Sequence, residues 1–266
     1  MSPHPSQNEL LASLAPAQWE QLRPHLEWVP LPLGTVLYEA GSALDHVYFP
    51  ATAIVSLVSP MKNGATAEVA VVGREGVVGV CAFMGGGRSL SSAVVQTAGF
   101  GLRMSAAAIN DAAKASSPLL QKLLRYTQSL FTLMAQTSAC NRHHELDQQL
   151  CRWLLLNHDR VLGDELVATH ERIANMLGVR REGVTSAALK LQSAGLIRYR
   201  RGLIEIVDRA GLEEASCECY AVIRQAYNRR PQYAGNDTRN DDVQSPVYRT
   251  RPLPARAVAA HSLAAA

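Results

Sequence analysis

Residues 180–186 carry side chains that could read nucleic acid. The segment reads Arg-Arg-Glu-Gly-Val-Thr-Ser. A guanidinium can bridge O6 and N7 of guanine, and a carboxylate can accept a hydrogen bond from N4 of cytosine. Around it, residues 169–203 contain seven basic and two acidic side chains, a local charge of +5, whereas residues 1–116 carry −2. Such a positive segment suits a polyanion partner, although a solvated basic face has the same composition.

Two short helices are expected to position this segment. Thr169 suits the N-cap of the first helix, because its hydroxyl can accept from a free amide of the first turn. Gly178 ends that helix, as glycine does where the chain turns through a left-handed conformation. Apolar residues at helical spacing give both helices a common inner face, which predicts a helix-turn-helix. These residues are Ile173, Ala174, Leu177, Val184, Ala188 and Leu191.

A β-hairpin is predicted to follow the helix pair. Residues 196–207 alternate apolar and polar positions around an Arg-Arg-Gly turn, which is typical of a wing. Basic side chains at a wing tip suit phosphate contacts, and the start of the second helix suits contacts with base edges. The predicted DNA-binding residues are Thr169, Arg180, Arg181, Glu182, Thr185, Ser186 and Lys190 in the helix pair, with Arg200 and Arg201 in the wing.

The first half of the chain has the pattern of an antiparallel β-domain. Between residues 33 and 104, short stretches rich in Val and Ile alternate with turns rich in Gly, Asn and Ser, which indicates a sandwich or barrel. The clearest strands are residues 35–38, 46–49, 54–58, 68–72 and 93–96.

A long helix is expected after Ser117 and Pro118, because no further Pro or Gly appears before Gly163. Two apolar stripes run along it at helical spacing, which suggests that one packs on its own domain and the other on a partner chain. We assign the first stripe to a dimer interface; a single broad core-facing helix is the alternative. That stripe contains Leu119, Leu123, Tyr126, Leu130 and Leu133, and the second contains Leu120, Leu124, Thr127, Phe131 and Met134.

Composition fits a folded protein in a reducing compartment. Of 266 residues, 47% are hydrophobic and 18% are charged, which argues against a mainly disordered chain. The five cysteines are too scattered for a disulfide framework, and Cys217 and Cys219 lack a second ligand pair nearby. We therefore expect no metal and no cofactor. The start of the chain lacks the basic segment of a secretory signal and no apolar run is long enough to span a membrane, so a cytoplasmic location is expected.

Residues 10–230 as a whole resemble the Crp/Fnr family of bacterial transcriptional regulators. The run Arg181-Glu182-Gly183-Val184-Thr185-Ser186 is similar to the family's recognition helix, which reads Arg-Glu-Thr-Val-x-Arg in the cyclic-AMP receptor branch. Ser186 stands in place of the second Arg, so the DNA target can differ. The stretch LGTVLYEAGSALDHVYF, residues 33–49, resembles the opening strands of the family's barrel.

The resemblance implies an α+β fold in three parts followed by a tail. A cyclic-nucleotide-binding-like antiparallel β-barrel is expected over residues 10–116, a dimerisation helix over 117–144 and a winged helix-turn-helix over 145–230. Residues 231–266 read as a disordered tail. The implied function is a homodimeric DNA-binding transcriptional regulator that reads an inverted repeat in double-stranded DNA. RNA polymerase and an unknown small effector are the further partners implied by the family.

The effector pocket is where the chain departs from nucleotide-binding members. Those members hold the ribose with a Gly-Glu pair and the cyclic phosphate with an Arg-Ser/Thr-Ala run. The matching residues here are Gly79 and Val80, then Ser91 and Ser92, so the carboxylate and the arginine are both missing. Arg88 lies three residues upstream and is the one candidate substitute. We expect a regulator that does not depend on cyclic AMP; the alternative is a cyclic-nucleotide sensor with a rearranged pocket.

Other classes of function have weaker support. The oxygen-sensing branch of the family holds an iron-sulfur cluster through cysteines near the N-terminus, and no cysteine here precedes Cys81. A phosphate loop at residues 85–87 would make the chain an enzyme, but the Lys-Ser/Thr that should follow is absent, so no catalytic residue is assigned. A protein-interaction module would leave the basic wing without a role.

Overall fold

The computed structural model describes residues 4–85, 87–161 and 163–228. The chain begins with η1 (Pro5–Gln7), α1 (Glu9–Ala12), α2 (Pro16–Leu22) and η2 (Arg23–His25). Asn8 caps α1 by accepting from the amide of Leu11, and its side-chain amide donates to the carbonyls of Pro50 and Gly76 at 2.9 Å each. This buried asparagine fastens the N-terminal helices to the β-domain.

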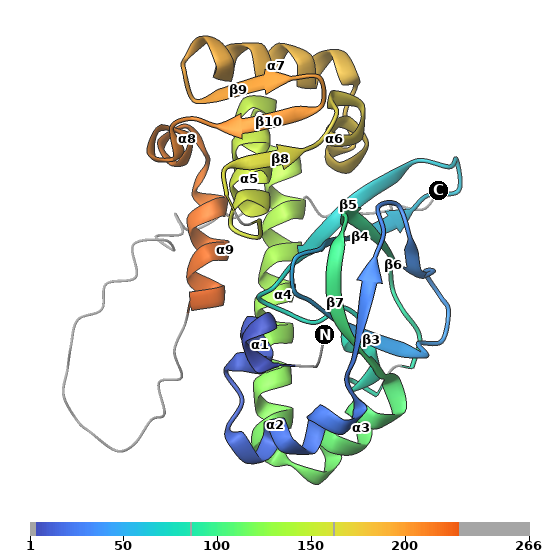
Figure 1. Cartoon of the computed structure of the whole chain (residues 1–266). Coiled ribbons are helices and arrows are strands. Elements are labelled where there is room, and N and C mark those ends of the chain that lie inside the picture. Colours follow the sequence, from blue (N-terminus) through green and yellow to red (C-terminus); the bar gives the residue numbers. More distant parts are fainter. Residues whose placement is uncertain (1–3, 86, 162, 229–266) are drawn as a thin grey trace, which may run out of the picture. The chain divides into compact units, whose positions relative to one another are not determined.

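Two antiparallel sheets form the β-domain (Figure 1). The first has the order β1 (Glu27–Leu31), β7 (Gly99–Ser105), β3 (His46–Pro50). The second has the order β2 (Val36–Tyr38), β6 (Ser92–Thr97), β4 (Ile54–Pro60), β5 (Thr66–Val72). Buried side chains such as Phe49, Ile54 and Leu102 fill the space between them.

The predicted antiparallel domain is confirmed, with one difference from a barrel. In the described residues the two sheets share no strand pairing that would close them into a single barrel. The edge strand β5 packs instead against α4 (Ser117–His143) and α6 (His170–Leu177).

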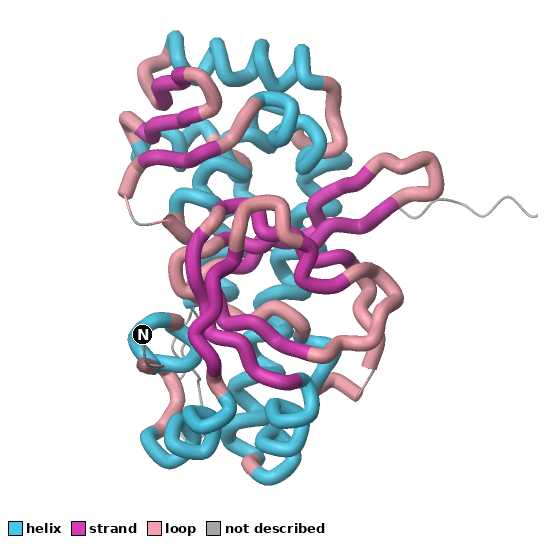
Figure 2. Tube along the Cα trace, turned by 45° about the vertical axis from the view of Figure 1, so that its right-hand side comes forward, coloured by secondary structure: helices cyan, strands magenta, loops and turns pink. Residues whose placement is uncertain are grey.

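Helix α4 follows α3 (Ala106–Ala115) and spans 27 residues. Ser116 caps its N-terminus by accepting from the amide of Leu119, and Pro118 lies in its first turn, as predicted. Figure 1 shows the helix passing beside the β-domain to the C-terminal elements, and the turned view of Figure 2 shows helices behind the strands of that domain. In the described part of the chain, no helix is long and apolar enough to cross a membrane.

The C-terminal elements form a helix pair and a small sheet. They are α5 (Leu146–His158), β8 (Glu165–Val167), α6, α7 (Arg181–Ser193), β9 (Ile197–Arg200), β10 (Leu203–Ile206), α8 (Arg209–Ala215) and α9 (Glu218–Asn228). The predicted hairpin is β9–β10, and β8 adds a third strand on the other side of β10. The tail predicted over residues 231–266 lies outside the described residues.

The assignment of the first apolar stripe to a dimer interface is wrong. Leu119, Leu123, Leu130 and Leu133 are at most 2% exposed within the single chain. Tyr126 is buried beside Gly76, where a Cβ would lie 2.2 Å from the phenol ring. Both stripes have the same spacing, so periodicity alone does not reveal that this one faces the chain's own β-domain and α9.

Candidate nucleic-acid interface and effector pocket

Local capping fixes the geometry of the helix pair. The hydroxyl of Thr169 accepts from the amide of Arg172 at 3.2 Å, and Gly178 ends α6 with a left-handed φ of 69°. Both features match the sequence prediction. Thr169 therefore serves as a helix cap, and its hydroxyl is already engaged by the backbone.

The first turn of α7 presents its polar side chains to solvent. Arg180, Arg181, Glu182 and Ser186 are exposed. Arg181 lies 3.8 Å from the carboxylate of Glu171, a loose pair between exposed groups. Exposed ion pairs contribute little to stability, so these side chains are free to exchange their solvent contacts for a nucleic acid.

Thr185 lies in a small contact network. Its hydroxyl donates to the carbonyl of Arg181 at 3.0 Å and lies 3.0 Å from Nδ1 of His170. The His170 ring stacks on Tyr199 with centroids 4.1 Å apart. Burial, followed by the charge of Arg181, lowers the pKa of His170. The network joins α6, α7 and the wing, and it includes His170 and Tyr199, two residues that no sequence pattern singles out.

Lys190 has a structural contact in addition to its predicted role. Its Nζ lies 2.7 Å from Oδ2 of Asp147, which links α7 to α5. A lysine in such a pair presents less free charge than the arginines at the start of α7.

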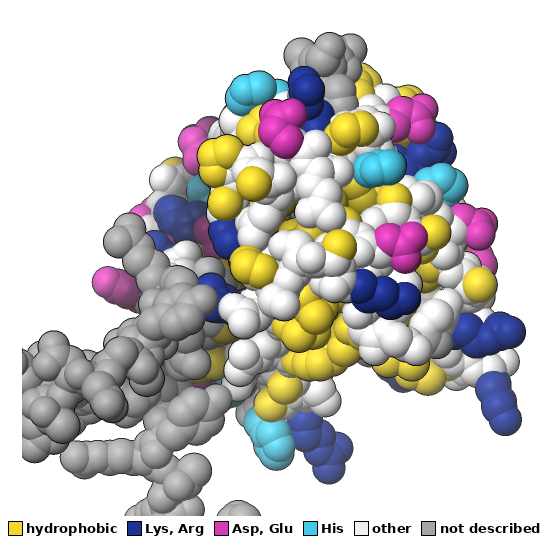
Figure 3. Space-filling model, turned by 90° about the horizontal axis from the view of Figure 1, so that it is seen from below, with side chains coloured by type: hydrophobic (Ala, Val, Ile, Leu, Met, Phe, Trp, Pro, Cys, Tyr) yellow, Lys and Arg dark blue, Asp and Glu magenta, His cyan; other side chains and the backbone are white. Residues whose placement is uncertain are grey.

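The wing tip carries unneutralised charge. Arg201 has φ 46° and Gly202 has φ 85°, so the chain reverses through two left-handed residues, as hairpin turns that match strand twist require. Arg198 pairs with Glu205 at 2.5 Å. Arg200 and Arg201 are exposed, and no described carboxylate pairs with them. By contrast, basic, acidic and hydrophobic side chains are interspersed around α2, α3 and the start of α4 (Figure 3).

The residues expected at the effector pocket lie at neighbouring turns of the β-domain. Gly79 has a left-handed φ of 100° and precedes a short helix, η3 (Val80–Ala82). Ser92 opens β6, where its hydroxyl donates to Oε2 of Glu39 at 2.7 Å and accepts from the amide of Ala40 at 3.0 Å. A carboxylate thus holds the hydroxyl that would be expected to contact a phosphate.

The other pocket residues are also engaged within the chain. Arg88 is exposed and donates to the carbonyl of Gly41 at 2.8 Å. Ser91 is buried, and its carbonyl accepts from the hydroxyl of Ser89 at 2.5 Å. The phenol of Tyr38 contacts the Ser89 side chain and the Gly79 backbone, and burial raises the pKa of Tyr38. A tyrosine therefore fills space between the two turns.

A buried polar cluster joins the β-domain to α5. Oε2 of Glu68 lies 2.6 Å from the hydroxyl of Ser56, and Oε1 accepts from the indole nitrogen of Trp153 at 3.1 Å. The same Ser56 hydroxyl lies 2.5 Å from Oε1 of Gln96, whose amide donates to Asn157 at 2.9 Å. Burial raises the pKa of Glu68 to about 7. A protonated Glu68 can donate a hydrogen bond to the Ser56 oxygen. The Ser56 hydroxyl hydrogen is then free to donate to Oε1 of Gln96.

Two arginines reinforce the same contact. The Nε atom of Arg160, two residues after α5, lies 2.8 Å from Oε1 of Glu75, and both side chains are buried or nearly so. Arg172 of α6 reaches the carbonyl of Val95 at 3.4 Å. The winged-helix elements are therefore held on the β4–β5–β6 sheet by polar contacts, which no pattern in the sequence indicates.

Comparison with known families agrees with this architecture. Residues 28–116 match the cyclic nucleotide-binding domain, and residues 148–215 match the Crp-like helix-turn-helix domain. No curated protein matches the chain at a significant level.

Solved structures share the fold at low sequence identity. A protein assigned to the transcriptional regulators of the Crp/Fnr family from Eubacterium rectale aligns with TM-score 0.62 and 19% identity over 79% of this chain and 98% of its own. FixK2 from Bradyrhizobium japonicum aligns with TM-score 0.62 and 16% identity; the alignment covers 72% of this chain and 98% of FixK2. The c-di-GMP responsive global regulator CLP from Xanthomonas campestris aligns with TM-score 0.57 and 15% identity; the alignment covers 72% of this chain and 99% of CLP.

A cyclic-nucleotide-binding domain, a long helix and a Crp-like helix-turn-helix in this order define a class of DNA-binding regulators. The chain belongs to the Crp/Fnr family of transcriptional regulators.

Proposed function

We propose that the protein is a homodimer that reads an inverted repeat through α7 and the wing, without dependence on cyclic AMP. The DNA-reading part rests on one observation: Arg180, Arg181 and Glu182 are exposed at the start of α7, and the two arginines of the wing tip pair with no carboxylate in the described part of the chain. Direct reading of bases needs exposed, positioned donors and acceptors, and phosphate binding needs free positive charge.

An exposed seam along α4 supports the dimer. The exposed positions 121, 124, 128, 131, 135 and 138 recur at alternating steps of 3 and 4, the spacing of a helix-helix seam. Within it, Leu124 is 44% exposed and Phe131 is 50% exposed. Leu124 and Phe131, two turns apart on this face, favour a second copy of α4 as the partner. A two-fold axis would make the DNA target palindromic.

The state of the pocket supports independence from cyclic AMP. The Glu39 carboxylate beside Ser92 would repel a phosphate, and the Arg88 guanidinium is directed to a backbone carbonyl. Phosphate recognition by arginine depends on a fixed bidentate geometry, which this arrangement does not offer. A sensor with a rearranged pocket is the second candidate, since Arg88 lies on an exposed turn.

Membership of the family supports two further parts of the proposal, RNA polymerase as a partner and the cytoplasm as the location.

Selection of bound DNA from a random pool tests the main proposal. The expected product is an inverted repeat with half-sites about one helical turn, near 10 base pairs, apart. Recovery of no enriched sequence would count against DNA reading, and enrichment of single half-sites would count against the dimer. Calorimetric titration with cyclic AMP, cyclic GMP and c-di-GMP then addresses the effector. We expect no cyclic AMP binding at micromolar concentration.

A further inference from the structure

Four side chains that prefer soft metal ions converge between the end of α4 and the start of α9. They are Cys140, His144, Cys217 and Cys219, and their ligand atoms all lie within 4.8 Å of one another. The three cysteines are at most 5% exposed, and the His144 side chain is 20% exposed. The sequence predicts no metal, because Cys217 and Cys219 have no second pair of ligands close to them in sequence. In the folded chain, Cys140 and His144 at the end of α4 supply that second pair.

The distances match a single tetrahedral ion. The sulfurs of Cys140 and Cys217 are 3.5 Å apart, and the sulfur of Cys219 lies 3.6 Å from Nδ1 of His144. Zinc bonds of about 2.3 Å to sulfur and about 2.0 Å to nitrogen at tetrahedral angles imply separations of about 3.8 Å and about 3.6 Å. A disulfide would require about 2.05 Å, and the five cysteines are free.

Groups around the cluster favour an occupied site. Nε2 of His144 lies 3.3 Å from Oε1 of Glu218, the carboxylate-histidine arrangement that orients a metal-binding imidazole. The buried guanidinium of Arg152 is held by Thr137 at 2.9 Å and Asn141 at 3.2 Å, and its charge acts on Cys140. Three thiolates around a divalent ion leave one net negative charge, which this arginine balances.

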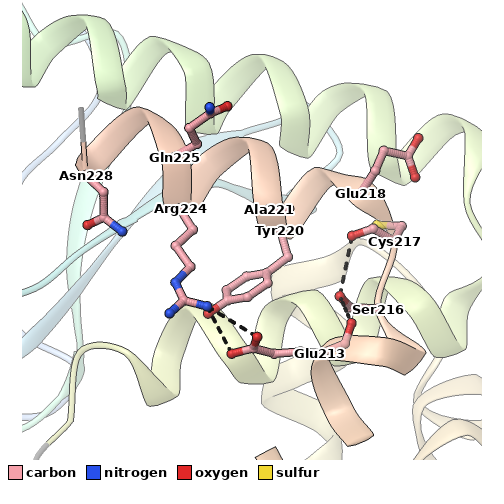
Figure 4. A pocket seen from close by; sticks show the side chains of 9 residues that line it. All are labelled: Glu213, Ser216, Cys217, Glu218, Tyr220, Ala221, Arg224, Gln225 and Asn228. Carbon is pink, nitrogen blue, oxygen red and sulfur yellow. Dashed lines mark hydrogen bonds and ion pairs between the residues drawn. The ribbon is translucent and has the colours of Figure 1, made fainter. Parts of the chain in front are cut away.

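Ordinary apolar packing explains the cluster less well. Cys151 is also fully buried, but it packs within the main hydrophobic core. The cysteines at 140, 217 and 219 form a separate small cluster, and their sulfurs meet an imidazole nitrogen. Cys217 and Glu218 also line a surface pocket, through which an ion could enter (Figure 4).

We propose that Cys140, His144, Cys217 and Cys219 bind one Zn²⁺ in a closed Cys₃His site that fastens α9 to the junction between α4 and α5. His144 is the C-cap of α4, and Glu145 is the N-cap of α5. The ion therefore fixes the position at which the long helix passes into the DNA-binding elements. Four protein ligands leave no open position, so the site is structural.

Metal content and Co²⁺ spectroscopy of the full-length protein test the proposal. The wild type, purified under reducing conditions, is expected to hold about one Zn²⁺ per chain. Co²⁺ added to the metal-free protein should give the visible absorption of a tetrahedral site together with thiolate charge-transfer bands. Cys217→Ser should weaken binding at least 100-fold, and Cys151→Ser, a change of the same kind at a buried cysteine outside the cluster, should leave it unchanged.

Second variants keep the result interpretable if Cys217→Ser does not fold. His144→Gln alters a ligand at the surface side of the cluster and should change the Co²⁺ spectrum, and Glu218→Gln should weaken binding about 10-fold. A wild-type chain that takes up no Zn²⁺ or Co²⁺ at micromolar concentration would overturn the proposal. So would equal metal content in Cys217→Ser and Cys151→Ser.

Discussion

Short local contacts position the side chains that we propose to face DNA. Thr185 bonds to the Arg181 carbonyl and touches His170, and His170 stacks on Tyr199 of the wing. The first turn of α7 and the wing are thereby held in one arrangement before any DNA is bound. Preorganised donors lose less freedom on binding, which favours base reading by the exposed arginines.

Arg181→Ala is expected to change which base is preferred. Removal of a bidentate hydrogen bond to guanine should cost about 1–3 kcal/mol per half-site and relax specificity at one base pair. Binding to the selected site and to its single-base variants measures this, with Arg23→Ala, an exposed arginine on η2, as the control. A uniform decrease in affinity with unchanged base preference would contradict the recognition-helix assignment.

A substitution at the wing tip should weaken DNA binding without changing the base preference. Arg201→Asn keeps a residue that tolerates the left-handed conformation seen at φ 46° while it removes the charge. We expect weaker binding to all sequences and a salt dependence lowered by about 1 for each phosphate that is no longer neutralised. Binding across a salt series checks this. Arg198→Gln is the matched control, because Arg198 already pairs with Glu205; an equal change in slope for both variants would argue against phosphate binding at the tip.

At the scale of elements, helix α4 separates two roles on two faces. Its inner face contacts the β-domain, α9 and, through Cys140 and His144, the proposed metal site. Its outer face keeps Leu124 and Phe131 exposed. The inner face is therefore occupied within the chain, and the outer face is left for the proposed second copy.

Polar substitution on the outer face should dissociate the dimer without unfolding the chain. Leu124→Gln with Phe131→Gln is expected to weaken association by about 2–3 kcal/mol, because less apolar surface is removed from water when two copies meet. Lys114→Gln, an exposed change on α3 outside the seam, should leave association unchanged. Sedimentation over a concentration series measures the dimer, and circular dichroism checks the fold. A double variant that dimerises like the wild type would place the interface elsewhere.

Elements with local signals could be predicted from the sequence. Thr169, Gly178 and the Arg-Arg-Gly turn act within a few residues, so the helix pair and the wing can be recognised without the structure. The role of Tyr126 depends on Gly76, and the metal cluster joins Cys140 to Cys217; these contacts cross 50 and 77 positions. No local periodicity encodes such pairings, so the inner face of α4 and the cluster required the folded structure.

At the scale of the whole molecule, buried polar groups join the winged-helix elements to the β4–β5–β6 sheet. Trp153 donates to Glu68, Asn157 accepts from Gln96, and Arg160 pairs with Glu75. The stability of a purely apolar contact does not depend on protonation. A contact that includes a buried carboxyl does, because burial disfavours the charged form of that group. The stability of this contact is therefore expected to depend on the protonation of Glu68.

The stability of the wild type should fall as the pH rises through neutrality. Burial raises the pKa of Glu68 from 4.5 to about 7, so the folded state keeps a proton that the unfolded state releases in this interval. The stabilisation is complete below about pH 4.5 and is lost as the pH rises through 7, by up to about 3 kcal/mol. Glu68→Gln, a neutral isostere, should remove this dependence, and Glu20→Gln, an exposed control, should retain it. Denaturant unfolding between about pH 5 and pH 8.5 measures each slope; parallel curves for the wild type and Glu68→Gln would show that Glu68 is not the group that titrates.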